Sequence, residues 1–219
     1  MTLRPEWLGT IPYGQALEQQ RTRREAIIRG EAPEAFWLLE HPPVITVGRR
    51  IVKDLPPHES LSEAGIELFS TERGGLATYH GPGQLVGYLL VDTEKRNLKV
   101  RETVERLERG IAEWLALYSI KAHSRTGYPG VWSGGDKICA IGMHFRHGVS
   151  MHGFALNVNI DLQGFKWITP CGIIDGGVTS MKQLLGQTPM VAHIAEEVGD
   201  QVLQSLFCSS VIDTRQQCG

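Results

Sequence analysis

The chain has 219 residues, enough for one large domain or two small ones. Hydrophobic residues make up 42% and charged residues 21%, which is ordinary for a globular protein, and the net charge of −2 gives no indication of general nucleic-acid binding. We find neither a run of ~20 apolar residues that could span a bilayer nor an apolar secretory signal, so we expect a cytoplasmic protein without membrane association. The cysteines at 139, 171, 208 and 218 lack zinc-site spacing, which predicts free thiols.

The first predicted elements are a helix and three strands. Residues 13–29 read as a helix, polar and basic on one side, which a glycine closes. Residues 35–40 and 44–47 read as strands on either side of a His-Pro-Pro break, and residues 85–91 are an apolar run that predicts a buried strand.

The second half of the chain predicts a long helix, a hairpin and a final helix. Apolar residues from Val100 to Tyr118 fall at helical spacing. Residues 138–146 and 151–160 are expected to form the hairpin. Thr188 and Pro189 are typical of the start of a helix that runs to about Phe207.

The second hairpin strand has two unlike faces. One face carries large apolar side chains, namely Phe154, Leu156, Val158 and Ile160. The other carries small or polar ones, namely Gly153, Ala155, Asn157 and Asn159. The second face leaves volume above the sheet. With mixed strands and helices, we expect one α/β or α+β domain over residues 1–219, with a loose tail at 209–219.

Three segments carry candidate chemistry. Cys171 follows a proline and precedes a glycine, Lys137 follows Gly-Gly-Asp, and a Gly-rich stretch runs from Arg73 to Gln84. A thiol attacks well only as thiolate, and a nearby ammonium group can supply that form at neutral pH. Glycines let backbone N–H groups approach a substrate closely. The three segments together favour covalent catalysis by a cysteine.

Four ordered blocks resemble the octanoyltransferases of lipoate biosynthesis. They read Arg-Gly-Gly-x-x-Thr-Tyr-His-Gly-Pro-Gly-Gln, Asp-Lys-x-x-Ala-Ile-Gly, His-Gly-Phe-Ala-Leu-Asn-Val and Pro-Cys-Gly-x-x-x-x-x-Val-Thr-Ser, at Arg73–Gln84, Asp136–Gly142, His152–Val158 and Pro170–Ser180. The resemblance extends from about Pro12 to Gly186. Four blocks at family spacing are far more specific than any single one.

The resemblance implies the biotin/lipoate protein ligase fold, a mixed β-sheet flanked by helices. It implies that Cys171 takes an octanoyl group from octanoyl-acyl carrier protein as a thioester. Lys137 would hold Cys171 as thiolate and then shuttle the proton. The acceptor would be a lysine in the lipoyl domains of 2-oxoacid dehydrogenases and in the glycine cleavage H protein. The step from thioester to amide is downhill, so we expect no ATP, no metal and no other cofactor.

The resemblance also implies three substrate-binding segments. Their residues are Arg73, Gly74, Gly75, Leu76, Ala77, Thr78, Tyr79 and His80, then Ala140, Ile141 and Gly142, and finally Gly153, Phe154 and Ala155. They combine small residues with exposed backbone, which suits an alkyl chain beside a thioester. Backbone N–H groups near Gly172 or Gly74-Gly75 could stabilise the oxyanion.

Simpler interpretations remain for several of these residues. Cys171 could be a packed core cysteine and Lys137 a solvated surface lysine. His80 is expected in the substrate segment, with a second interpretation as the base of a Cys-His dyad. Arg73 could be a surface charge, a substrate contact or a residue that shapes its loop. Cys139 lies in an apolar strand and is expected in the core.

Two surface features have competing interpretations. Arg49, Arg50 and Lys53 form either a solvated face or a docking site for an acidic carrier protein or its phosphate. The histidines at 144, 147 and 152, with Cys139, have spacing that suits no metal-ligand set.

Two other functions compete with octanoyl transfer. The first is an ATP-dependent lipoate or biotin ligase of the same fold, but this chain lacks the phosphate-binding loops of such ligases. Its Val47-Gly48-Arg49-Arg50 segment is only a faint likeness of them. The second is a protein that binds lipoyl domains without transferring anything to them.

Overall fold

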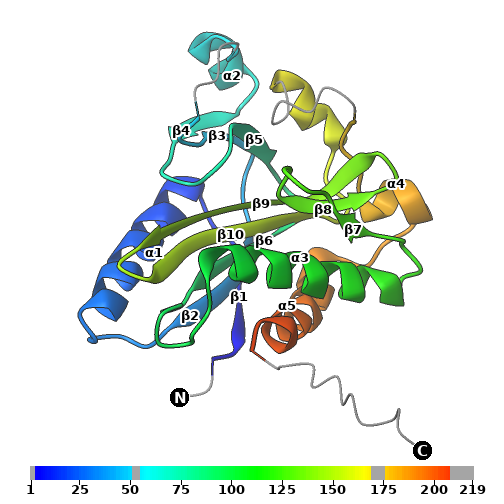
Figure 1. Ribbon diagram of the computed structural model, residues 1–219. Coiled ribbons are helices and arrows are strands. Elements are labelled where there is room, and N and C mark those ends of the chain that lie inside the picture. Colours follow the sequence, from blue (N-terminus) through cyan, green and yellow to red (C-terminus); the bar gives the residue numbers. More distant parts are fainter. Residues whose placement is uncertain (1–2, 51–54, 169–175, 208–219) are drawn as a thin grey trace, which may run out of the picture.

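The computed structural model describes residues 3–50, 55–168 and 176–207, and its centre is a seven-stranded sheet (Figure 1). The strand order is β1-β2-β6-β10-β9-β8-β7, and each neighbouring pair is antiparallel except β1 and β2. The strands are β1 (Pro5–Thr10), β2 (Ala35–Glu40), β6 (Gln84–Leu90), β10 (Val149–Asn157), β9 (Asp136–Arg146), β8 (Gly130–Ser133) and β7 (His123–Ser124).

A three-stranded sheet lies beside the large one. In it β3 (Val44–Val47) pairs in parallel with β4 (Glu67–Ser70) and antiparallel with β5 (Ala77–His80). Two short helices, α2 (His58–Glu63) and η1 (Leu162–Trp167), pack on this sheet.

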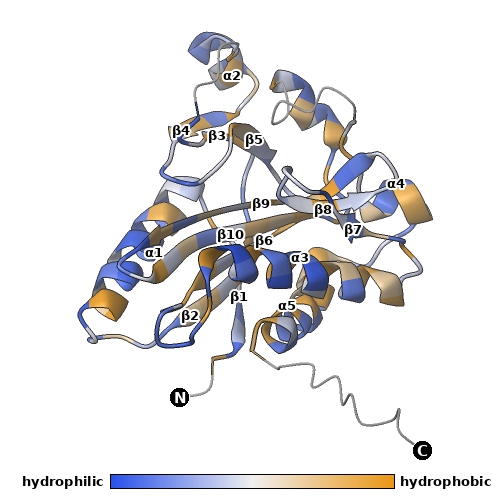
Figure 2. Ribbon diagram, viewed as in Figure 1, coloured by the Kyte–Doolittle hydropathy of each residue, from blue (hydrophilic) through white to orange (hydrophobic). Residues whose placement is uncertain are grey.

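Helices cover both faces of the large sheet. On one face, α3 (Val100–Leu117) and α5 (Val191–Phe207) enclose a core cluster in which Trp114 is buried. On the other face lies α1 (Tyr13–Ile28), while α4 (Met181–Leu185) follows the segment 176–180. Figure 2 shows the reason: α1 and α3 carry both hydrophilic and hydrophobic residues, whereas the central strands are mostly hydrophobic. Among the described helices, we find none long and apolar enough to cross a membrane.

Most of the predicted elements are confirmed with small shifts in their ends. The predicted helices at 13–29 and 100–118 are α1 and α3, and the predicted strands at 35–40, 44–47 and 85–91 are β2, β3 and β6. The hairpin is β9 and β10. The sequence analysis did not predict β1, α2, β4, β5, β7, β8, η1 or α4, which are all six residues long or shorter. The expected tail at 209–219 lies outside the described residues.

The predicted end of one strand and the predicted start of one helix are wrong. The strand β10 ends at Asn157 rather than Ile160, because the next backbone N–H groups leave the ladder. Those of Val158, Asn159 and Ile160 all donate to Gly83 O, at 3.1, 2.9 and 3.1 Å. Ile160 therefore joins the core of the small sheet rather than the face that Phe154 and Leu156 share. The last helix begins at Val191 rather than Pro189.

Gly199 of α5 provides a test of the helix packing. A Cβ at this position would meet Pro5 Cβ and would lie 2.9 Å from Leu38 Cδ1. Because both contacts are shorter than real Cβ atoms show, the overpacking cost lies in the upper part of its usual range, about 2–3 kcal/mol. A gain of about 1 kcal/mol in helix propensity leaves a net loss of about 1–2 kcal/mol. We therefore expect Gly199→Ala to lower Tm by roughly 2–8 °C in thermal unfolding. Gly135→Ala is the control, because no atom lies within 4 Å of its Cβ. Equal Tm values for the two variants would contradict the described packing of α5 on β1 and β2.

Candidate active site

A cavity of about 550 Å³ opens over β9 and β10 and gathers most of the predicted site residues. Its volume lies in the range of pockets that bind small ligands. The predicted residues that line it are Arg73, Gly74, Gly75, Leu76, Thr78, His80, Lys137, Ala140, Ile141, Gly142, Gly153, Phe154 and Ala155. Ala77 and Tyr79 lie instead at buried positions of β5, where the Tyr79 ring packs 5.6 Å from that of Phe165.

Small residues create the cavity. In the ladder, Gly153 faces Gly142 and Ala155 faces Ala140, so little side-chain volume stands above these strands. This confirms the space that the alternation along the second hairpin strand predicts.

The loop after Arg73 covers an edge of the sheet. Pairing between β8 and β9 runs only as far as Ala140, and beyond it the Gly74 N–H donates to Met143 O at 3.1 Å. The guanidinium of Arg73 donates to Thr46 Oγ1, to Thr46 O and to Gly74 O. Arg73 is therefore buried and shapes its loop, and the surface-charge alternative is wrong.

Lys137 lies on β9 rather than in a Gly-rich turn, and only 7% of its surface is exposed. Its Nζ donates to Pro129 O at 3.2 Å and lies 4.8 Å from the centre of the Trp132 ring. The surface alternative for this lysine is therefore wrong. An ammonium group in so buried a position needs such partners, because burial removes its hydration.

The segment after Cys171 runs beside Lys137. The Lys137 N–H donates to Gly177 O and the Thr179 N–H donates to Lys137 O, both at 3.0 Å. Cys171 itself lies outside the described residues, so its role stays a prediction. Cys139 is fully buried, and burial raises the pKa of its thiol. This confirms Cys139 as a core residue.

Glu108 is a neighbour of the site that the sequence analysis missed. Its Oε1 accepts the Gly130 N–H at 2.8 Å, and burial raises the pKa of its carboxyl while Lys137 lowers it. The signal was present in the sequence: Glu108 follows Val104 by four residues and precedes Ile111 by three, which places it on the apolar face of α3.

His80 is held on both ring nitrogens. Nδ1 bonds to Gln84 Oε1 at 2.7 Å and Nε2 to the Thr46 hydroxyl at 3.4 Å. Burial, with the neighbouring His41, lowers the pKa of His80 to about 3. These bonds favour the substrate-segment interpretation over that of a dyad base, which needs a nitrogen available for the thiol.

His152 lines the same cavity in an unusual conformation. Its φ is +63°, and its N–H donates to buried Gln20 at 2.9 Å. A left-handed residue breaks the strand alternation, so the ring of His152 packs at 6.3 Å from Tyr88 on the α1 side. Both ring nitrogens are buried without a hydrogen-bond partner among the described residues. They are suited to an ordered water or a polar atom of a ligand.

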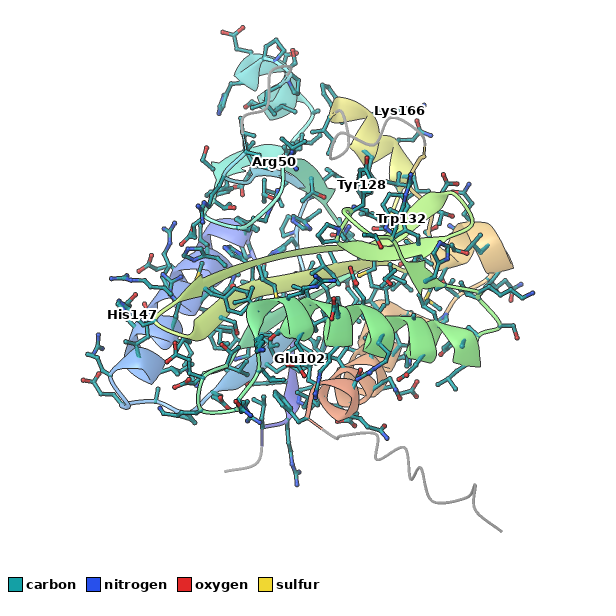
Figure 3. All side chains as sticks on the ribbon, in the orientation of Figure 1. Arg50, Glu102, Tyr128, Trp132, His147 and Lys166 are labelled. Atoms are coloured by element: carbon teal, nitrogen blue, oxygen red, sulfur yellow. The ribbon has the colours of Figure 1, made fainter. Side chains whose placement is uncertain are left out.

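The other residues considered for a metal site have other neighbours or lie apart from one another. His144 Nδ1 bonds to Arg24 at 2.9 Å, and Cys139 Sγ lies 3.6 Å from Ala140 O. His147 stands at the tip of the hairpin (Figure 3). Within the described ranges, we find no group of three or more His, Cys, Asp or Glu side chains that could hold a metal ion.

Basic residues stand at the rim of the cavity. The backbone N–H groups of Arg49 and Arg50 donate to Arg73 O and Gly75 O, at 3.1 and 3.3 Å, and Arg50 lines the cavity. Figure 3 shows Arg50 beside the small sheet, and Tyr128 and Trp132 on the β8 side. Lys53 lies outside the described residues.

Comparison with known proteins decides the family. Residues 12–203 match the model of the lipoyl protein ligase A/B catalytic domain. An octanoyltransferase of Alkaliphilus metalliredigens is 44% identical over 94% of this chain and 96% of its own. One of Rubrobacter xylanophilus is 46% identical over 87% of each chain. The chain belongs to the octanoyltransferase family.

Solved structures show the fold of this octanoyltransferase family member. A bipartite lipoate protein ligase of Thermoplasma acidophilum matches with a TM-score of 0.69 and 15% identity, over 94% of this chain and 84% of that one. A biotin protein ligase of Aquifex aeolicus matches with a TM-score of 0.53 and 14% identity, over 93% and 70%. These matches confirm the expected biotin/lipoate protein ligase fold.

The loop glycine Gly75 provides a test of the octanoyltransferase cavity. Its φ is +90° and its added Cβ would lie 3.4 Å from Arg73 Nη1. We expect Gly75→Ala to slow octanoyl loading at least about tenfold, because it adds strain and bulk at the cavity wall. Loading is measured by intact mass over time. Gly65→Ala is the control, since Gly65 also has a left-handed φ, +68°, but no atom within 4 Å of its Cβ. Similar loading rates for both variants would show that Gly75 does not form part of the wall against which the octanoyl group binds.

The buried histidines predict the pH dependence of stability. Burial lowers the pKa of His41 to about 4 and of His80 and His152 to about 3, from an ordinary 6.5. Below pH 6.5 the unfolded chain therefore binds more protons than the folded protein. The contribution of these histidines to the free energy of unfolding is complete above pH 6.5. It decreases as the pH falls toward 4, by up to about 1.4 kcal/mol per pH unit for each histidine.

Urea unfolding at pH 7.5 and pH 5.5 measures this loss. We expect His152→Asn to reduce the difference between the two pH values, because asparagine tolerates left-handed backbone and does not titrate. An unchanged difference would show that His152 takes up a proton as readily in the folded protein as in the unfolded chain.

Proposed function

We propose that this octanoyltransferase forms an acyl-enzyme on Cys171 and that Lys137 serves as its proton carrier. The observation that carries the proposal is the cavity, which Lys137 lines together with the segments at 73–76, 140–142 and 153–155. Small residues and exposed backbone along an apolar slot suit an alkyl chain, and the lysine stands beside the segment that follows Cys171. His80 and Thr78 line the slot from β5.

The environment of Lys137 supports its role. An ammonium group among Trp132, Pro129 O and the Glu108 carboxyl stays in place with little freedom. Beside such a group a thiol ionises more readily, because the charge attracts the thiolate in a medium that screens weakly. The same nitrogen can then give up a proton and take it back.

The reaction consists of two balanced half-reactions. The Cys171 thiolate attacks the thioester carbonyl carbon, the new S–C bond forms, and the carrier sulfur leaves and takes a proton from the Lys137 ammonium. The amine of the acceptor lysine then attacks the acyl-enzyme. As the C–N bond forms and the C–S bond breaks, the amine proton passes to neutral Lys137 and Cys171 returns as thiolate. The sum converts a thioester and an amine into an amide and a thiol, with no ATP, metal or other cofactor.

We infer the two protein partners from the family. The donor is octanoyl-acyl carrier protein, and Arg50, which lines the cavity, together with its neighbour Arg49 suits its acidic surface or its phosphate. The acceptors are lipoyl domains of 2-oxoacid dehydrogenases and the glycine cleavage H protein. A lipoate protein ligase with this fold is described together with its E2 lipoyl domain. We place the reaction in the cytoplasm, where thiols stay reduced.

Intact mass after mixing with octanoyl carrier protein tests the acyl-enzyme. We expect the wild-type protein to gain one octanoyl group, which hydroxylamine or an acceptor domain then removes. Cys171→Ala should gain none, whereas Cys139→Ala, which changes a buried core thiol, should still load. Loading should proceed without ATP or magnesium. ATP-dependent transfer by Cys171→Ala would replace the proposal with the ligase alternative.

Lys137 is tested by the rate at which iodoacetamide alkylates Cys171, followed by peptide mass. An unassisted thiol has a pKa of about 8.5, so little thiolate exists at neutral pH. We expect Lys137→Ala to slow alkylation at pH 6.5 at least about tenfold and to reduce transfer further, since a proton carrier is lost as well. Alkylation at the wild-type rate would contradict the role of Lys137.

A further inference from the structure

A line of hydrogen bonds runs through the interior from the Arg73 loop. The Arg73 guanidinium donates to Thr46 Oγ1 from Nε and Nη2, at 3.1 and 2.9 Å. The Thr46 hydroxyl donates to His80 Nε2 at 3.4 Å, the longest link of the line, and His80 Nδ1 donates to Gln84 Oε1 at 2.7 Å. The line thus connects the small sheet with β6 of the large sheet.

The line continues to Lys137. Gln84 Nε2 donates to Asn157 Oδ1 at 2.8 Å, and Asn157 Nδ2 donates to Thr179 O at 2.9 Å. The Thr179 N–H donates to Lys137 O at 3.0 Å. Each side chain in this line is buried, so water does not compete for these bonds.

The two ends of the line fix the direction of every bond in it. A guanidinium can only donate, and a backbone carbonyl can only accept. Because Thr179 O accepts, the amides of Asn157 and Gln84 must each turn their nitrogen toward it and their oxygen away from it. His80, which is neutral because burial lowers its pKa to about 3, then donates from Nδ1 and accepts at Nε2. The Thr46 hydroxyl, which already accepts twice from Arg73, is left to donate to that nitrogen. Asn157 must therefore present its oxygen to Gln84 and its nitrogen to Thr179, and among side chains of this size only a protonated aspartate could also accept and donate in this way.

Asn157 stands where three parts of the site meet. It is the last residue of β10, its oxygen holds β6, and its nitrogen holds the segment 176–180. That segment forms hydrogen bonds with both backbone groups of Lys137: Gly177 O accepts the Lys137 N–H, and the Thr179 N–H donates to Lys137 O. The β9–β10 ladder reaches only as far as Cys139, so the Asn157 amide, through the segment 176–180, adds a separate hold on the backbone of Lys137.

We propose that Asn157 is a positioning residue that fixes Lys137 at the place where its ammonium group acts. The proposal rests on the proposed function, in which Lys137 holds the nucleophile as thiolate. Without the Asn157 amide, the buried Thr179 carbonyl has lost its donor, and the segment 176–180 moves to find another. The backbone of Lys137 moves with it, and the ammonium–thiolate attraction falls with distance.

The test uses the full-length protein and three Asn157 variants. Asn157→Leu removes both bonds, and Asn157→Asp keeps the acceptor for Gln84 but, wherever its carboxyl is ionised in the range from pH 6 to 9, loses the donor to Thr179. Asn157→Ser adds neither bulk nor charge and is too short to reach Thr179 O; it carries the test where the other two do not fold. The readouts are the rate of alkylation of Cys171 by iodoacetamide from pH 6 to 9, octanoyl loading, and Tm.

Ser150 offers a matched control on the same strand. It is also fully buried, its hydroxyl donates to Leu89 O at 2.7 Å, and it accepts the Val91 N–H at 3.0 Å. Ser150→Ala therefore removes two interior hydrogen bonds of β10 far from Lys137 in the register. It reports what a general loss of stability does to the readouts.

We expect the Asn157 variants to raise the alkylation midpoint by about one pH unit, which slows alkylation at pH 6.5 about tenfold. Octanoyl loading at pH 7 should fall by a similar factor, while Ser150→Ala lowers Tm and leaves the midpoint unchanged. A wild-type midpoint in folded Asn157 variants, or an equal shift in Ser150→Ala, overturns the proposal. If Lys137→Ala is slow while the Asn157 variants are normal, only the role of Asn157 is lost. If Lys137→Ala is itself normal, the proposed function is lost.

Discussion

Burying a lysine ammonium group is the costly requirement around which this site is built. The charge loses its water and must find substitutes within the protein, or it becomes neutral. Here the substitutes come from Pro129 O, the face of Trp132 and the nearby Glu108 carboxyl. The strand β8 carries Trp132 and α3 carries Glu108, so side chains from two other elements stabilise the Nζ atom of Lys137. The position of the Lys137 ammonium group is thereby set by the packing of the core.

The sequence predicted the parts of this fold whose patterns are long. The apolar spacing along α3 and the alternation along β10 extend over many residues, and both indicated the correct element. The spacing along α3 also indicated its buried face, and the alternation along β10 indicated which of its side chains share a core cluster, although both faces of that strand are buried. The short strands have no such signal. The strand β5 lies between two Gly-rich stretches and has only four residues, so its local sequence is typical of a loop. It becomes a strand because Tyr79 and Ala77 are buried against β3.

In the candidate site too, the sequence predicted some features and not others. Motifs indicated Lys137, the glycine loop and the small residues of β9 and β10, and the cavity brings these together. The sequence could not show that Arg73 turns inward to Thr46, because that contact joins residues 27 positions apart across two elements. It also left open a solvated surface position for Lys137, whereas the strand begins at Asp136 and Lys137 pairs with Trp132 in the ladder. Contacts between segments that are distant in the sequence determine where these side chains lie, and the residues next to them in the sequence do not indicate those contacts.

The walls of the cavity come from segments as far apart as Tyr13 and Ala155, and this spread has a consequence for folding. The central strand β6 pairs with β2 on one side and with β10 on the other, more than sixty residues later. Such non-local pairing is slow to form, and during synthesis the ribosome must release β10 before the slot has a floor. A nascent chain that stops short of the second hairpin strand has the glycine loop but no cavity for it to cover. The chain therefore has no slot for an acyl group until β10, which ends at Asn157 of the 219 residues, has left the ribosome.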